Sequence, residues 1–182
     1  MGPSAAPTPP ALLLIGCSRR KAPGLARARA WDLYDGRLFQ VLKKVLRDRE
    51  GWERDVAVLI VSARYGVIRL GQVIETYDER LTGESVRRRR DRFTGQLQSA
   101  VAGRDFRAVR IDLGRPYRAA LPDLDALFAP TPVDWASGGI GARNARTRRW
   151  VLDQLDDDAP ALSGGTPGPR SSRPGPRSDS RP

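Results

Sequence analysis

Two short, continuous apolar runs constrain the fold of this chain more than any other feature. The first is Ala11-Leu-Leu-Leu-Ile-Gly16, and the second is Asp55-Val-Ala-Val-Leu-Ile-Val61. Runs of this length without polar alternation are typical of strands that are buried on both faces of a parallel sheet. Such a sheet needs helices on both faces, so the two runs predict an α/β fold.

The remaining segments carry helical and strand patterns that fit this fold. From Ala26 to about Glu50, apolar residues recur every three or four positions, which predicts an amphipathic helix with Gly36 as a point of interruption. Val109, Ile111 and Leu113 alternate with polar residues, which predicts a third strand over 106–113. Further helices are expected over 84–102, 116–121 and 142–155.

The length of 182 residues allows one domain. We expect residues 11–158 to form a single compact α/β domain with a mainly parallel central sheet flanked by helices. Residues 1–10 are expected to be a flexible N-terminus. Residues 159–182 are rich in Pro, Gly, Ser and Arg. They are predicted to be a disordered tail because they offer almost no apolar surface to bury.

Composition excludes several kinds of chemistry. The chain has no His, which excludes a Ser-His-Asp triad, an imidazole base and a His-containing zinc site. Its single cysteine, Cys17, excludes an internal disulfide and a multi-Cys metal cluster, so any metal would have to be held by carboxylates. We expect neither a metal nor a cofactor. The formal net charge of +11 favours anionic partners: a nucleotide, a nucleoside or a nucleic acid.

The hydropathy pattern predicts no membrane partner. The longest apolar run, Ala11 to Ile15, is far shorter than the ~20 residues that cross a bilayer. Residues 1–10 carry no basic region of the kind that begins a secretory signal. We therefore expect a cytoplasmic protein, and its oligomeric state is left open.

A polar or glycine-containing cluster follows each predicted strand. In open α/β sheets, ligands bind beyond the carboxyl ends of the strands, so these clusters are expected to meet at one crevice. The candidate substrate-binding residues are Cys17, Ser18, Lys21, Ser62, Arg64, Tyr65, Gly66, Tyr77, Gly114 and Tyr117. The candidate catalytic residues are Asp78 and Asp112.

The residue types suggest roles at a nucleobase site. Asp78 or Asp112 could stabilise positive charge on a sugar or direct a water molecule, and Tyr65 could stack on a base. Lys21 or Arg64 could hold a phosphate. Each residue also has a structural interpretation: strands end in polar residues, and a lone Cys without a His partner is commonly a small buried side chain.

Four segments carry a resemblance to a known family. They are Leu14-Ile-Gly-Cys-Ser-Arg-Arg-Lys21, Val61-Ser-Ala-Arg-Tyr-Gly-Val67, Ile74-Glu-Thr-Tyr-Asp78 and Leu113-Gly-Arg-Pro-Tyr117. In this order and spacing, the chain resembles the DUF6884-type family of small bacterial and phage proteins of unknown function. That family is marked by Cys-Ser-x-x-Lys, Ser-Ala-x-Tyr-Gly and Tyr-Asp. The resemblance covers roughly residues 11 to 155.

More remotely, the chain is similar to peroxide-stress DNA-binding proteins and to the uracil-DNA-glycosylase-like domains of archaeosine synthesis. These resemblances imply nucleobase or nucleic-acid chemistry. The water-activating Asp and the His motifs of true uracil-DNA glycosylases have no match here, so their reaction cannot be transferred residue by residue.

Two classes of function stay open. One is a protein that binds a nucleobase or nucleotide, with hydrolysis of an N-glycosidic bond or base transfer as its reaction if it is an enzyme. The alternative is a non-enzymatic DNA- or RNA-binding protein that uses basic helices and no pocket. The basic residues concerned are Arg87–Arg90, Arg92, Arg143, Arg146, Arg148 and Arg149.

Overall fold

A computed structural model describes residues 7–156, which form a five-stranded sheet in the order β4-β3-β1-β6-β7. Its strands are β1 (Ala11–Gly16), β3 (Val56–Ser62), β4 (Gly66–Arg69), β6 (Val109–Asp112) and β7 (Val133–Trp135). β3, β1, β6 and β7 are parallel, and β4 is an antiparallel edge strand. The predicted mainly parallel sheet is confirmed. The predicted disordered tail, 159–182, and residues 1–6 of the predicted flexible N-terminus lie outside the described residues.

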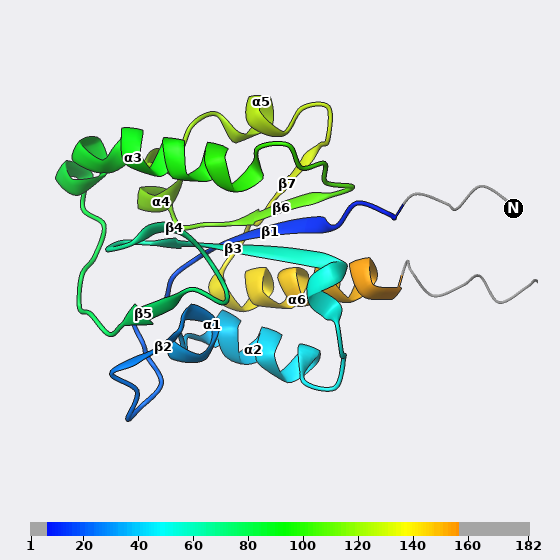
Figure 1. Cartoon of the computed structure of the whole chain (residues 1–182), viewed down its shortest axis with the longest axis horizontal. Helices are drawn as coiled ribbons and strands as arrows, with labels where there is room; N and C mark the ends of the chain where they lie inside the picture. The colour runs from blue at the N-terminus through cyan, green and yellow to red at the C-terminus, as the bar shows by residue number, and fades with distance from the viewer. Residues whose placement is uncertain (1–6, 157–182) are drawn as a thin grey trace, which may run out of the picture.

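Helices cover both faces of this sheet (Figure 1). One face carries α1 (Ala30–Leu33), α2 (Arg37–Leu46) and α6 (Ile140–Asp156). The opposite face carries α3 (Gly83–Val101), α4 (Arg115–Ala119) and α5 (Leu124–Phe128). A 3₁₀ turn, η1 (Trp52–Arg54), precedes β3. The α/β class is therefore confirmed, and the predicted helices over 84–102, 116–121 and 142–155 correspond to α3, α4 and α6.

The first apolar run becomes the central strand. β1 coincides with the predicted strand, and its residues Ala11 to Ile15 have no exposed surface. Leu14 lies in register with Leu59 of β3 on one side and with Ile111 of β6 on the other. A strand with neighbours on both sides and helices over both faces needs apolar side chains at every position, which explains the uninterrupted run.

The predicted single helix from Ala26 to Glu50 is wrong. Arg27–Arg29 instead forms β2, which pairs antiparallel with β5 (Val73–Glu75), and two helices follow, α1 and α2. The chain is extended at Tyr34 and at Gly36, which separates the two helices. Both helices pack against the same core, so the spacing of their apolar residues resembles that of one continuous helix although the backbone is interrupted.

Five further elements had no sequence prediction: η1, β4, β5, β7 and α5. The third strand, predicted over 106–113, is confined to Val109–Asp112. Arg110 and Asp112, the polar residues of its alternating pattern, are 3% and 5% exposed.

Among residues 7–156, no helix combines the length and the apolar character needed to cross a membrane.

Candidate functional site

A pocket lies at the carboxyl ends of β1 and β6, which are neighbours in the sheet. From β1 the chain reaches β3 through α1 and α2 on one face, and from β3 it reaches β6 through α3 on the other face. This is the point at which the strand order reverses, where open α/β sheets leave a crevice. The sequence analysis expected the polar clusters after all three predicted strands to meet at one crevice; the clusters after β1 and β6 line this pocket, and the cluster after β3 does not.

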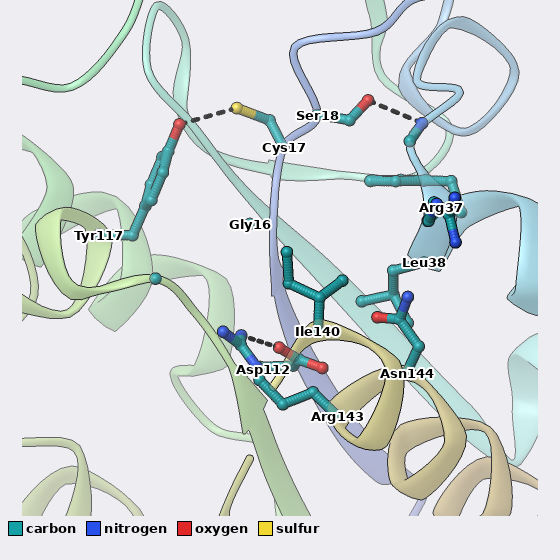
Figure 2. Close-up of a pocket in the computed structure, with 13 residues that line it drawn as sticks. Gly16, Cys17, Ser18, Arg37, Leu38, Asp112, Tyr117, Ile140, Arg143 and Asn144 are labelled. Carbon is teal, nitrogen blue, oxygen red and sulfur yellow. Dashed lines mark hydrogen bonds and ion pairs between the residues drawn. The ribbon is translucent and has the colours of Figure 1, made fainter. Parts of the chain in front are cut away.

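The pocket has a volume of about 330 Å³ and is built from four segments (Figure 2). Residues 16–18 follow β1, residues 112–117 connect β6 to α4, and the first residues of α2 and α6 complete the walls. Five of the predicted site residues line it: Cys17, Ser18, Asp112, Gly114 and Tyr117. The sequence analysis did not predict the lining residues Gly16, Gly36, Arg37, Leu38, Phe39, Ile140, Arg143 and Asn144.

Cys17 and Tyr117 meet across the gap between β1 and α4. The Cys17 Sγ lies 3.2 Å from the Tyr117 hydroxyl, with both side chains half-buried. Burial raises the pKa of Tyr117, and the nearby Cys17 raises it further. Tyr117 therefore keeps its proton at neutral pH and presents a neutral hydroxyl, able to donate or accept a hydrogen bond.

Ser18 fixes the start of α2 beside the pocket. Its hydroxyl donates to the Arg20 carbonyl at 2.5 Å and accepts the Gly36 N–H at 3.1 Å. A Cβ at Gly36 would lie 2.5 Å from the Ser18 Cβ, so this close approach requires glycine. Gly36 is also where the predicted helix is interrupted, and this interruption brings α2 to the pocket.

Asp112 is held by α6. Its carboxylate forms an ion pair with Arg143 and accepts a hydrogen bond from the Thr147 hydroxyl at 2.8 Å. Thr147 also accepts a hydrogen bond from Arg110 Nε at 3.0 Å, and Arg110 pairs with Asp134 of β7. The negative charge of Asp112 is thus compensated inside the wall of the pocket.

A second group of predicted residues forms a buried hydroxyl cluster with Tyr34. The Ser62 Oγ lies 3.1 Å from the Tyr34 hydroxyl and 2.7 Å from the Tyr77 hydroxyl, and the two tyrosine hydroxyls are 2.8 Å apart. Lys21 Nζ lies 4.1 Å from the centre of the Tyr77 ring. Lys21, Ser62 and Tyr77 do not line the pocket.

Burial shifts the titration of this cluster. It raises the pKa of Tyr34 and of Tyr77, and Cys17 raises both further. It lowers the pKa of the Lys21 amine, against the opposing influence of Cys17 and Asp78. Cys17 therefore acts on both groups: it raises the pKa of Tyr77 in the cluster, and its Sγ lies 3.2 Å from the Tyr117 hydroxyl in the pocket.

The turn after β3 holds a third group of predicted residues. Gly66 has φ +80°, and a Cβ there would lie 1.8 Å from Gln96 Oε1, so the turn needs glycine. The Tyr65 hydroxyl bonds both backbone groups of Glu75, donating to its carbonyl at 3.3 Å and accepting its N–H at 3.2 Å. Arg64 and Asp78 are exposed. These four residues do not line the pocket either.

Two arginines of α3 hold the same turn. Arg89 donates to the Ala63 carbonyl and pairs with Glu79, while Arg92 donates to the Tyr65 carbonyl at 3.1 Å. Arg89, one of the four arginines Arg87–Arg90, therefore stabilises the turn after β3. Within residues 7–156, no group of three or more His, Cys, Asp or Glu side chains is arranged to hold a metal ion.

The fold and the pocket define the chain as a doubly wound α/β protein with a ligand-sized crevice at its topological switch point. A sequence model of DUF6884, described as a family of unknown function, matches residues 12–149. The chain belongs to this family, which confirms the resemblance. No curated protein and no solved structure matches the chain.

Proposed function

We propose that the pocket at the ends of β1 and β6 binds a nucleotide. The observation that carries this proposal is that the pocket combines an apolar wall with an unpaired cation at its edge. Its volume of about 330 Å³ lies at the small end of the range for ligand pockets. This size suits a single nucleoside unit better than a large dinucleotide cofactor.

The apolar wall comes from two helices. Ile140, the first residue of α6, lines the pocket although 70% of its surface is exposed. Leu38 of α2 is half-buried and lies near it, on the same side of the pocket as Asn144 (Figure 2). The flat face of a base would cover these side chains, and polar groups such as the Asn144 amide could bond its edge.

The electrostatics of the pocket favour an anion. Asp112, the one carboxylate in the lining, is compensated by Arg143. Arg37 is exposed, and its guanidinium forms no hydrogen bond or ion pair with another residue of the described range 7–156. Its guanidinium is therefore free to pair with a phosphate, and the net charge of +11 adds a field that attracts anions.

The geometry supports binding more directly than cleavage of an N-glycosidic bond. Such a reaction needs a carboxylate that faces the sugar or its attacking water. Both oxygens of Asp112 are engaged, by Arg143 and by Thr147, and Asp78 does not line the pocket. Hydrolysis or base transfer stays a prediction, which release of free base would reveal.

Calorimetric titration with a panel of nucleosides and nucleotides tests the proposal, with chromatography of each mixture for released base. Ile140→Glu places a negative charge at the pocket and should weaken nucleotide binding at least tenfold. Val73→Glu is the matched control, because Val73 is also an exposed apolar residue (52%) and lies on β5, outside the pocket. Absence of binding across the panel, or equal weakening by both variants, contradicts the proposal.

A further inference from the structure

The pocket continues into a groove between α2 and α6. The groove has a volume of about 860 Å³ and shares Gly36, Arg37 and Asn144 with the pocket. The two helices lie against each other on one face of the sheet (Figure 1). A ligand that entered the pocket could therefore extend along the groove without leaving the protein surface.

The groove carries uncompensated positive charge. Asp35 is the one carboxylate among its lining residues, and it pairs with Arg20 at 2.8 Å. Arg37, Lys44 and Arg148 also line it, and all three are exposed. None of these three forms an ion pair with another residue of the described chain, 7–156.

These charges are spread along the groove. Arg37 and Lys44 are seven residues apart on α2, which is two helical turns or about 10 Å of helix axis. Arg148 stands on the other wall, on α6. A mononucleotide in the pocket could reach Arg37, because Arg37 lines both the pocket and the groove. Lys44 and Arg148 line the groove but not the pocket. A row of phosphates would engage all three.

We infer that the groove holds the phosphodiester backbone of a single-stranded nucleic acid, one nucleotide of which occupies the pocket. This inference rests on the proposed function, because it assigns the pocket's nucleotide to a polymer. The pocket favours a single strand over a duplex, since a paired base is stacked and must be extruded before it can enter a cavity.

The basic residues of α3 are arranged differently. Arg88 pairs with Glu84 and Arg89 pairs with Glu79, so their charges are largely compensated. α3 also covers the opposite face of the sheet from α2 and α6 (Figure 1). A strand bound along α3 could not place a base in the pocket, which distinguishes this inference from binding by basic helices in general.

The test compares two double variants with equal loss of charge. Lys44→Ala with Arg148→Ala removes groove cations, and Arg87→Ala with Arg90→Ala removes exposed cations of α3 as the control. Fluorescence anisotropy measures the affinity for a short labelled single strand, as DNA and as RNA. Calorimetry measures the affinity for the mononucleotide, and thermal unfolding confirms that each variant is folded.

The groove variant should bind the single strand at least tenfold more weakly, and its dependence of log affinity on log salt should fall by about 1.4 for two lost phosphate contacts. The control should lose less than threefold. Equal losses in both variants would overturn the inference, as would a wild-type affinity for the single strand no greater than for the mononucleotide.

Two further arms separate the possible failures. If wild-type protein binds the mononucleotide but the single strand gains nothing from the groove, the inference fails and the proposed function stands. If no mononucleotide binds, the proposed function itself fails. Polyglutamate at matched charge concentration serves as a competitor. Displacement of the strand by polyglutamate as effectively as by unlabelled strand would overturn the assignment to nucleic acid.

Discussion

Arg143 of α6 forms an ion pair with Asp112, the last residue of β6, and Thr147 one turn later donates its hydroxyl to the second carboxylate oxygen at 2.8 Å. The same hydroxyl accepts from Arg110 Nε. One buried threonine therefore joins two oppositely charged side chains of β6 to α6, and α6 supplies a wall of the pocket. The network positions the pocket as well as stabilising the sheet.

Thr147→Val should lower the free energy of unfolding by about 1–3 kcal/mol, because it leaves buried polar groups of Arg110 and Asp112 without a partner. Thr147 has no exposed surface, so water cannot replace the hydroxyl. Chemical denaturation measures the effect. Thr147→Ser keeps the hydroxyl and should recover most of the loss, whereas a Val variant as stable as wild type would contradict the role assigned to the network.

Ser62→Ala should also cost about 1–3 kcal/mol. The Ser62 hydroxyl contacts the Tyr34 and Tyr77 hydroxyls and accepts the Tyr65 N–H at 3.1 Å. Ser62 itself has no exposed surface. Ser99→Ala is the control because Ser99 is exposed on α3, and it should change stability by less than about 0.5 kcal/mol. Equal effects of the two substitutions in urea titrations would exclude a stabilising role for the hydroxyl cluster.

Stability should fall steeply in the alkaline range. Burial raises the pKa of Tyr34, Tyr77 and Tyr117 above the ordinary value of about 10 that these groups have in the unfolded chain. Their contribution is therefore fully present below pH 10 and is lost as the pH rises toward the folded-state values. The pKa of Lys21 is lowered by folding, so Lys21 acts in the opposite direction. Its contribution to stability rises with pH between its folded-state pKa and its higher pKa in the unfolded chain.

Unfolding at a series of pH values, followed with tyrosinate absorbance, checks this dependence. The tyrosinate absorbance of Tyr34, Tyr77 and Tyr117 should increase together with the loss of structure. Tyr77→Phe removes one of the linked groups, so the variant should lose less stability above pH 10 than wild type does. Titration of all tyrosines near pH 10 in a protein that stays folded would contradict the expected coupling.

Leu14→Ala should destabilise the protein by about 2–5 kcal/mol, the cost of emptying a packed core site. Leu14 has no exposed surface, and its strand neighbours are Leu59 and Ile111. Leu59→Ala, at 4% exposure, should have a comparable effect. Leu25→Ala provides the comparison, because Leu25 is 40% exposed. Thermal or denaturant unfolding that shows no difference among the three variants would contradict this packing.

The sequence by itself determined two buried strands, the fold class and part of the pocket lining. The runs Ala11 to Gly16 and Asp55 to Val61 predict buried strands because an uninterrupted apolar run is a local property that does not depend on the order of the strands, and they correspond to β1 and β3. Cys17 and Asp112 were expected to be neighbours because parallel strands end at the same edge of a sheet, and the pocket lining includes both.

The tertiary structure decided which segments complete the pocket and which predicted residues lie apart from it. Leu38 and Ile140 line the pocket because α2 and α6 pack side by side, a long-range contact that no local pattern encodes. Tyr65 follows β3, and the Tyr77 hydroxyl lies beside Ser62, the last residue of β3. The carboxyl end of β3 lies on the far side of β1 from β6. Strand order depends on the packing of the whole chain. The sequence therefore predicts that the strand ends lie at one edge of the sheet, but it does not predict which strands are adjacent there.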